Sequence, residues 1–455
     1  MLENLDSQEA HLRLEEVNKA IESGMFAKAR QIIELMPPCD IALILESSPP
    51  ANRKLLWNLT VHDQQGEILE ELNEDAKDSI IDLMSASHLV AATEGMDTDD
   101  LAYILRGIPT SLYQDVLEQM DTQDRLRVEQ ALAYPEDTAG SIMNTDTITL
   151  RPDVSVDVVL RYLRIKGELP EATDTLYVVN EQDKLIGDVP LATLLTVDPD
   201  RSIADLMDSK TETLAVDLDE SEIAKLFERH DWISAPVVDE HNHLVGRITI
   251  DDVVDIIREN ADHTMMGMAG MDDDEDTFAP ILPSVKRRTV WLFVNLIAAF
   301  LAASVSNMFE ATLEQMATLA VLMTIVPSMG GIAGNQTLAL VIRGMAVGHI
   351  NDTNTRWLIG KEAAIGLING MVWALLVATA VTLWKGDIML GYIIAGAMFI
   401  NLSAAGIAGV TIPLVMKKYN IDPALAGGMA LTTVTDVIGL FSFLGMATLV
   451  LQHGG

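Results

Sequence analysis

A carboxylate lies in the middle of a long apolar stretch near the end of the sequence. The segment 427–451 has the length and composition of a membrane helix, yet Asp436 stands near its centre, in the run LTTVTDVIG. Charged side chains are costly in hydrocarbon and usually mark a path for an ion or a substrate. Thr432 and Thr435 add hydroxyl oxygens beside it. These residues predict a polar site inside the membrane.

Two other apolar stretches carry polar and small residues that could complete this site. The run IVPSMGGIAGNQT contains Pro327, Gly331 and Asn335. Because of this proline and these glycines, we expect a helix broken at mid-membrane there. Such a break is tolerated only where the freed carbonyl groups lie beside a cavity or another helix. The run FINLSAAGIAG places Asn401 among small residues, a composition that favours close helix packing.

The available donor groups predict the kind of cation. The basic residues within the apolar stretches are Arg343 and Lys361, each near the end of its stretch, so no side chain is placed to neutralise Asp436. The apolar stretches contain no Cys or His and offer only oxygen ligands. Hard oxygen donors suit Mg²⁺ or Ca²⁺, whereas softer transition metals prefer sulfur and imidazole. Mg²⁺ also keeps its waters, so a pore could hold it hydrated through few carboxylates.

Five apolar stretches are long enough to cross about 30 Å of hydrocarbon, which takes roughly 20 helical residues. They cover residues 289–309, 317–347, 360–384, 389–416 and 424–451. Positive charges cluster just before or at the start of the first, third and fifth stretches. They are Lys286, Arg287, Arg288, Arg356, Lys361, Lys417 and Lys418. Because cytoplasmic loops carry excess Lys and Arg, we expect a multi-pass protein of the cell (inner or plasma) membrane with a cytoplasmic N-terminal part and the C-terminus outside.

The charge of the chain is concentrated before the apolar stretches. The 455 residues carry a formal net charge of −37. Seven of the 67 acidic and nine of the 30 basic residues lie from Lys286 onward, so the preceding part carries about −39. Such a field attracts cations and repels phosphates and anionic lipid heads, which argues against a nucleic-acid partner. The single cysteine, Cys39, excludes a disulfide framework, and the acidic N-terminus is not a signal peptide.

The part before the membrane divides into two kinds of fold. Residues 1–135 show short amphipathic helical patterns, and we expect an all-α superhelical domain. Residues 136–260 contain a repeat, because IMNTDTITL matches LMDSKTETL and YVVNEQDKLIGDVPLATLL matches PVVDEHNHLVGRITIDDVV. Each copy predicts strand, helix, strand, turn, strand and helix.

This repeat resembles a tandem of cystathionine β-synthase (CBS) domains, here at 136–200 and 201–260. The resemblance implies an α/β regulatory module that often binds adenosine nucleotides. In the second copy, Thr249 and Asp251 match the nucleotide-binding positions of the family, whereas GDVPLAT in the first copy lacks the pair. One ATP site is therefore expected, for regulation, because no Walker P-loop is present to hydrolyse nucleotide.

A connector joins the repeat to the membrane part. Residues 261–288 contain the acidic run Asp272–Asp276 and two prolines. We interpret this segment as a connecting helix and hinge, followed by an all-α membrane domain of five helices at 289–455.

Taken in order, these features closely resemble the MgtE family of magnesium channels. The matching runs are YPEDTAGSIM, TIDDVVDII, GGxAGNQ and the pair DPALAGG and TTVTD. The resemblance implies a homodimer with its pore on the two-fold axis and Asp436 of each subunit at the selectivity site, with Asn335, Gly331, Thr432 and Thr435 as further pore residues. One departure is Ile332, where the family commonly has Asn.

The resemblance also implies regulation by cytosolic Mg²⁺. The acidic domains repel themselves, so divalent ions bridging carboxylates would favour a compact, closed state. The candidate ligands are Asp97, Asp99, Asp100, Asp251, Asp252, Asp255, Glu259 and Asp262. Uptake itself needs no pump, because a divalent ion gains about 4.6 kcal/mol per 100 mV of inside-negative potential.

Two alternatives remain open on the sequence. The chain could carry another divalent cation such as Co²⁺, or it could be a membrane-anchored metal sensor that transports nothing. A membrane enzyme is disfavoured, because motifs such as HExxH and GxSxG do not occur.

Overall fold

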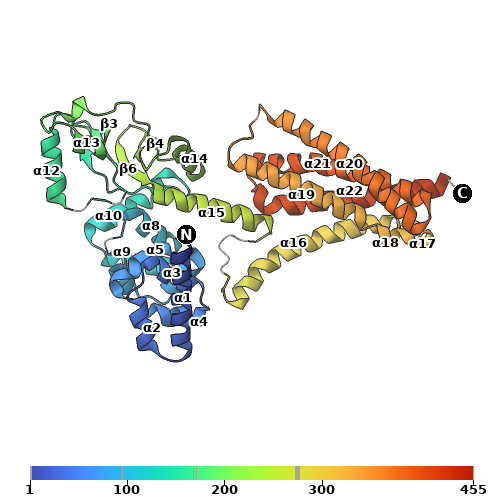
Figure 1. Cartoon of the computed structure of the whole chain (residues 1–455), viewed down its shortest axis with the longest axis horizontal. Coiled ribbons are helices and arrows are strands. Elements are labelled where there is room, and N and C mark those ends of the chain that lie inside the picture. Colours follow the sequence, from blue (N-terminus) through green and yellow to red (C-terminus); the bar gives the residue numbers. More distant parts are fainter. Residues whose placement is uncertain are drawn as a thin grey trace. The chain divides into compact units, whose positions relative to one another are not determined.

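The computed structural model describes residues 3–94, 96–167, 169–170, 172–271, 277–351 and 353–453. The acidic run Asp272–Asp276 therefore lies outside the described residues. The chain forms two compact units (Figure 1). The first comprises Met1–Asn260 with Asp274–Pro280, and the second comprises Ala261–Asp273 with Ile281–Gly455. Each unit is described by itself.

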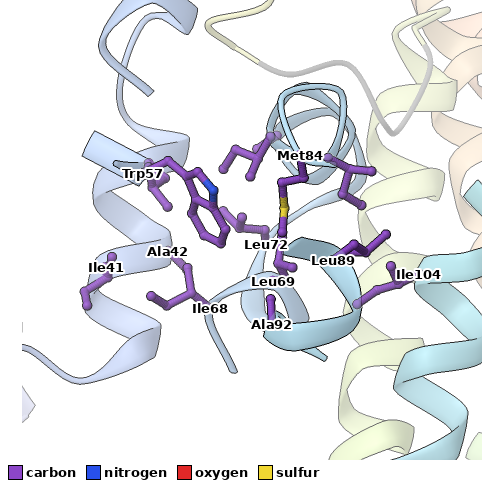
Figure 2. Packing of buried hydrophobic residues seen from close by; sticks show 14 of the residues in the cluster. Ile41, Ala42, Trp57, Ile68, Leu69, Leu72, Met84, Leu89, Ala92 and Ile104 are labelled. Carbon is purple, nitrogen blue, oxygen red and sulfur yellow. The ribbon is translucent and has the colours of Figure 1, made fainter. Parts of the chain in front are cut away.

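The first part of the first unit is helical throughout, which confirms the all-α prediction. Its elements are α1 (Glu3–Glu22), α2 (Phe26–Ile33), α3 (Pro38–Glu46), α4 (Pro50–Trp57), η1 (His62–Gln64), α5 (Gln65–Glu71), α6 (Glu74–Ile81), α7 (Ala86–Ala92), α8 (Thr98–Gly107), α9 (Thr110–Gln119) and α10 (Thr122–Ala131). Their apolar faces meet in one core, which Figure 2 shows around Trp57, Leu69 and Met84.

Local signals in the sequence start these short helices. Pro38 and Pro50 each stand in the first turn of a helix, where the missing N–H costs nothing. Asn73 Oδ1 accepts a hydrogen bond from the Ala76 N–H at 2.9 Å, and Ser85 Oγ accepts one from His88. Such N-caps satisfy backbone donors that a helix start leaves free.

The two repeats fold as two small sheets of the same design, which confirms the predicted CBS pair. The elements are α11 (Ala139–Ile142), β1 (Thr149–Leu150), α12 (Val156–Lys166), β2 (Thr175–Val179), β3 (Leu185–Pro190), α13 (Leu191–Thr196), η2 (Ile203–Asp205), β4 (Leu214–Ala215), α14 (Glu220–His230), β5 (Ser234–Val238), β6 (Leu244–Thr249) and α15 (Ile250–Met268).

Each sheet pairs its first strand parallel to the second and its second antiparallel to the third. The register shifts at equivalent points, Val178/Val179 in one copy and Val237/Val238 in the other. The predicted boundary between the second repeat and the connecting segment, at residues 260 and 261, falls inside a helix. Helix α15 continues from the second repeat past Asn260 into the second unit.

The second unit is all-helical and contains the five predicted spans. Its helices are α16 (Ile281–Met308), α17 (Glu310–Gln315), α18 (Thr318–Leu322), α19 (Ile325–Ala346), α20 (Thr355–Lys385), α21 (Ile388–Lys418) and α22 (Pro423–His453). Five of the described helical segments are long and apolar enough to cross a membrane, with α18 and α19 forming one of them. The first begins at Ile281, eight residues before the apolar stretch seen in the sequence.

The predicted break in the second span is wrong in its position. The run IVPSMGGIAGNQT lies in the continuous helix α19, and the interruption falls before it, at Met323 and Thr324. Pro327 is tolerated because it lies in the first turn of α19, where a proline displaces little. The glycines instead allow close packing.

Helices α20 and α21 illustrate that packing. A β-carbon on Gly406 would lie 2.8 Å from the Glu362 carbonyl oxygen, and one on Gly366 would lie 2.9 Å from that of Leu402. Small residues therefore bring the two backbones together, as the composition of these stretches predicts.

Candidate cation sites

Helices α19 and α22 pack antiparallel, and their contacts show which residues of the two helices lie opposite one another. A β-carbon on Gly331 would lie 3.8 Å from Thr435 Oγ1, one on Gly334 would lie 3.0 Å from the Leu431 side chain, and one on Gly427 would lie 3.2 Å from that of Leu338. This series places Gly331 opposite Thr435, next to Asp436. The predicted residues of the membrane site therefore lie on two neighbouring helices, and Gly331 and Thr435 face each other.

Asn401 of α21 fills the space between these helices. Its side chain is fully buried, and Nδ2 donates a hydrogen bond to the Val326 carbonyl oxygen at 2.8 Å. β-Carbons on Gly330 and Gly439 would lie 2.2 and 2.9 Å from that nitrogen. The amide oxygen of Asn401 is buried without a hydrogen-bond partner among the described residues. The sequence predicted close packing by the small residues around Asn401, and the structure places its amide against both α19 and α22, with a hydrogen bond to α19.

The carboxylate of Asp436 is half-buried and has no hydrogen bond or ion pair within the described part of the chain. Thr432 lies one turn before it on the same face, and its hydroxyl donates to the Gly428 carbonyl. Asn335 and Ile332 are exposed on α19. Thr435 is fully buried beside Gly331, and its hydroxyl donates to the carbonyls of Leu431 and Thr432. Thr435 therefore supports the helix contact, whereas Thr432 and Asp436 share a more open face.

A second buried carboxylate in this unit was not singled out from the sequence. Glu362 of α20 is 3% exposed, and its Oε2 accepts a hydrogen bond from Thr337 Oγ1 of α19 at 3.2 Å. Lys361 Nζ lies 3.1 Å from the other oxygen. The sequence signal was available, since an acidic residue in the first part of an apolar helix must find partners when it is buried. That its partner is Thr337 on α19 depends on the fold.

In the first unit, the start of α8 gathers three of the predicted regulatory carboxylates. Oxygens of Asp97, Asp99 and Asp100 lie within 4.8 Å of one another. Asp97 accepts a hydrogen bond from Asn144 Nδ2. Asp99 is 7% exposed, and its Oδ1 is buried without a hydrogen-bond partner among the described residues. Burying an unpartnered carboxylate oxygen is costly unless a proton or a cation accompanies it.

The start of α15 adds Asp252 to this cluster. Burial first, and then the charges of Asp252, Asp100 and Asp97, raise the pKa of Asp99 well above its usual range. Burial and the charges of Glu70 and Asp252 raise the pKa of Asp100 to about 8. Burial and the charge of Asp251 raise the pKa of Asp252 to about 7, although hydrogen bonds from Thr249 oppose this. The structure thus joins residues about 150 positions apart in the sequence into one site.

The remaining predicted ligands lie along α15. Asp251 is exposed. Asp255 Oδ1 lies 3.6 Å from Arg258 Nη2. Burial and the charge of Asp255 raise the pKa of Glu259, and the charge of Glu74 on α6 adds to this rise. Asp262 is exposed and lies in the second unit. Of the predicted set, Asp97, Asp99 and Asp100 lie together, and the charge of Asp252 raises the pKa of Asp99 and Asp100. Glu70, which also raises the pKa of Asp100, is an addition that the sequence did not indicate.

The two nucleotide candidates are placed differently. Thr249 is buried, and its hydroxyl and N–H both donate to Asp252 Oδ2, at 2.9 and 3.2 Å. These hydrogen bonds stabilise the first turn of α15, as capping interactions at a helix N-terminus do. Asp251 remains on the surface.

The far end of α15 lies against the start of α22 within the second unit. His263 Nε2 is 2.9 Å from Asp422 Oδ2. Asp422 also accepts hydrogen bonds from the Ala424 and Leu425 N–H groups, so it caps α22 ahead of Pro423. Within the second unit, the last part of α15 is therefore held against α22, the helix that carries Asp436.

A helical domain, a CBS pair and five apolar helices, one of which carries a carboxylate near its middle, are the features of a multi-pass membrane transport protein. Family models agree: that of the divalent cation transporter MgtE matches residues 323–446, that of the MgtE intracellular N domain matches 36–137, and that of the CBS domain matches 139–200 and 203–259. The chain belongs to the MgtE family of magnesium transporters.

Relatives support this membership over the whole length. The magnesium transporter MgtE of Bacillus subtilis strain 168 is 29% identical over 450 residues, covering 98% of this chain and 99% of its own. That of Enterococcus faecalis strain V583 is 30% identical over 326 residues, 72% of each chain. Among solved structures, the cytosolic domain of the Mg²⁺ channel MgtE in complex with ATP is 28% identical, with a TM-score of 0.50, covering 53% of this chain and 99% of that one.

Proposed function

We propose that this transporter is a homodimeric channel that admits Mg²⁺ to the cytosol down its electrochemical gradient and closes when cytosolic Mg²⁺ binds the first unit. The observation that carries the proposal is the cluster of Asp99, Asp100 and Asp252. Burial and the charges of neighbouring carboxylates raise the pKa of each of these three side chains, and Asp252 is among the charges that act on Asp99 and Asp100. A divalent cation is the ligand that would relieve that repulsion.

The pore of this proposal lies at Asp436. In a dimer, the exposed faces of α19 and α22 would meet their twins, and two Asp436 carboxylates could share one hydrated cation. Gly331, Asn335, Thr432 and Thr435 lie on the same two helices. No basic side chain neutralises Asp436 within the described residues, which favours a cation as its partner.

The gate of this proposal is α15. Mg²⁺ at its first turn would hold α8 and α15 together, and its last turns contact the start of α22 through His263 and Asp422. A continuous helix transmits displacement better than a loop does. ATP at Thr249 and Asp251 would act as a regulator; a solved relative of the first unit is an ATP complex.

The orientation follows from the basic clusters beside the first, third and fifth spans. They support a first unit in the cytosol and a C-terminus outside. An inside-negative potential of 100 mV would then drive entry by about 4.6 kcal/mol.

The test is Mg²⁺ flux into liposomes that contain the full chain. Wild type should carry Mg²⁺ inward under an inside-negative potential, and Asp436→Ala should abolish the flux. Asp99→Asn and Asp252→Asn should keep the flux but require more Mg²⁺ on the first-unit side to stop it. Asp63→Asn is the matched control, because Asp63 is exposed and is not among the charges that raise the pKa of Asp99 or Asp100.

Two outcomes would contradict the proposal. Unchanged flux in Asp436→Ala would remove the pore assignment and leave a metal sensor. Flux of Co²⁺ with none of Mg²⁺ would make the chain a transporter of a different ion.

A further inference from the structure

The turn between β5 and β6 gathers three metal-ligating side chains away from both cation sites. Asp239, His241 and His243 each offer a ligand atom within 4.8 Å of the others. Asp239 Oδ2 lies 2.9 Å from His243 Nδ1. The two imidazole rings lie 5.9 Å apart between centroids and 26° from parallel. All three are at least partly exposed to solvent, so an ion could reach them.

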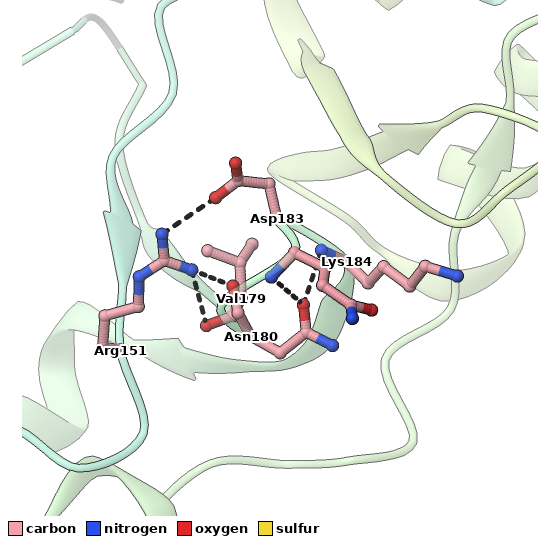
Figure 3. Close-up of polar contacts among 6 residues, drawn as sticks. Arg151, Val179, Asn180, Asp183 and Lys184 are labelled. Atoms are coloured by element: carbon pink, nitrogen blue, oxygen red, sulfur yellow. Dashed lines mark hydrogen bonds and ion pairs between the residues drawn. The ribbon is translucent and has the colours of Figure 1, made fainter.

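The equivalent turn of the first repeat shows which of these side chains the fold requires. There, Asn180 Oδ1 accepts hydrogen bonds from the N–H groups of Gln182 and Lys184, at 2.9 and 3.0 Å (Figure 3). Asp239 Oδ1 makes the same two bonds in the second repeat, to the N–H groups of His241 and His243, at 2.9 and 2.8 Å.

Both turns also place one residue in the left-handed region, Asp183 at φ 57° and Asn242 at φ 65°. The turn therefore forms equally well with Gln and Lys at the two positions where the second repeat has histidines. The imidazole rings are not needed for the fold, and their convergence requires another explanation.

We propose that Asp239, His241 and His243 form a binding site for a divalent d-block cation such as Zn²⁺, Co²⁺ or Ni²⁺. Two imidazoles and one carboxylate are a borderline donor set, which these ions prefer and Mg²⁺ does not. Three protein ligands leave coordination positions for water or a further group. The site is chemically distinct from the all-oxygen clusters at Asp99 and Asp436, and the proposal stands whether or not the proposed gating is correct.

The carboxylate is prepared for either of two roles. Asp239 Oδ1 accepts hydrogen bonds from the His241 and His243 N–H groups, and Oδ2 lies against Nδ1 of the His243 ring. Asp239 either binds the cation directly or holds Nδ1 of His243 while Nε2 binds the metal. In the second case it raises the basicity of the ring, as carboxylates behind metal-bound histidines do.

The turn is also held in place, so little order is lost when an ion binds. Asn242 Nδ2 donates to the Leu185 carbonyl oxygen at 2.9 Å, and its own carbonyl accepts from the Leu185 N–H at 3.0 Å. The Leu244 N–H donates to the Asp183 carbonyl oxygen at 3.3 Å. These bonds join the turns of the two repeats, so a cation on the second turn would sit at the contact between both halves of the CBS pair.

The internal repeat supplies a set of test variants that should fold. H241Q/H243K gives the second turn the residues that Gln182 and Lys184 provide in the first, and D239N gives it the counterpart of Asn180. Glu240→Gln is the control, because it removes a neighbouring charge and leaves the three ligands intact. The experiment titrates the purified full chain with Co²⁺ in excess Mg²⁺, which occupies the oxygen sites, and follows the visible absorption of bound Co²⁺.

Wild type and E240Q should show one saturable Co²⁺ site whose absorption indicates nitrogen ligands. H241Q/H243K should lose that signal, and D239N should weaken Co²⁺ affinity by about 10-fold or more. Circular dichroism of each variant confirms the fold. An identical Co²⁺ titration for wild type and H241Q/H243K would overturn the proposal, as would the absence of nitrogen-type absorption in wild type.

Discussion

The side-chain nitrogen of Asn401 occupies the position into which a β-carbon on Gly330 would project. The two atoms would lie only 2.2 Å apart, and the same nitrogen donates to the Val326 carbonyl. We predict that Gly330→Ala displaces Asn401 and lowers the free energy of unfolding by about 1–3 kcal/mol, as overpacking of a tight core does. Thermal unfolding of the protein in detergent measures the loss.

A matched control separates this clash from a general effect of glycine replacement. Gly360 of α20 has open space where a β-carbon would be added, so Gly360→Ala should leave stability unchanged or slightly raised. The double variant G330A/N401A should recover part of the loss, because the colliding amide is gone. Equal unfolding temperatures for G330A and G360A would contradict the clash with Asn401.

The carboxylate cluster at α8 and α15 predicts a pH dependence with a definite sign. The pKa of Asp100 is raised to about 8 and that of Asp252 to about 7, so the folded state binds protons that the unfolded chain releases near pH 4. These groups therefore destabilise the metal-free fold progressively as pH rises from about 4 to about 8.

Mg²⁺ must displace these protons, so we expect its apparent affinity to rise between pH 6 and pH 8 and its binding to release protons. Titration in weak buffer with a pH electrode measures the release. Asp99→Asn should reduce it, whereas Asp63→Asn should not. Mg²⁺ binding that is independent of pH over this range would count against the cluster as a metal site.

Asp422 has two functions that can be separated. Asp422→Ala removes the cap of α22, and we expect a loss of about 0.5–2 kcal/mol in stability. Asp422→Asn keeps a good capping residue but loses the charge that faces His263, so it should unfold near the wild-type temperature. If transport is gated through α15, Asp422→Asn and His263→Ala should both shift the Mg²⁺ concentration that stops flux. A shift confined to Asp422→Ala would assign the residue a capping role alone.

Glu362 should be a stabilising residue of the membrane unit. Glu362→Gln retains an oxygen for the Thr337 hydroxyl and should be tolerated. Glu362→Ala leaves a cavity and a buried hydroxyl without that partner, and we expect it to cost about 2–5 kcal/mol. Thermal unfolding distinguishes the two, and Glu314→Ala, which removes an exposed carboxylate of the same unit, provides the control. Equal melting of E362A and E314A would contradict this role.

The sequence predicted most of the fold because each element carries its own signal. Helical periodicity, the repeated strand pattern around VVNEQDKLIG and VVDEHNHLVG, and the length of the apolar stretches are local properties of the chain. The predicted break at Pro327 was wrong because a proline within a helix pattern does not reveal whether it lies in a first turn. That depends on where the helix begins, which here is set by the turn at Met323 and Thr324.

The sites were predictable in their residue types and less so in their groupings. The oxygen-rich composition around Asp436 indicated a hard cation from the sequence alone. That Asp252 joins Asp99 and Asp100, while Asp251 next to it stays exposed, follows from the rotation of α15 and from its packing. Thr435 and Asp436 are likewise adjacent in the sequence but face different surroundings. Neighbouring residues of a helix point about 100° apart, so a cluster of acids in the sequence does not tell which ones meet.

Because α15 is one uninterrupted helix, the number of residues between Asp252 and His263 determines how the two side chains are oriented relative to each other. Asp252 and His263 are eleven positions apart, close to three full turns, so both project from nearly the same side of the helix. Inserting one residue between them would rotate His263 by about 100° away from Asp422, although every original side chain remained present. An insertion of seven residues, about two turns, would restore the phase while lengthening the helix by about 10 Å. Homologous chains that use this helix in the same way should therefore vary in the composition of this segment far more readily than in its number of residues.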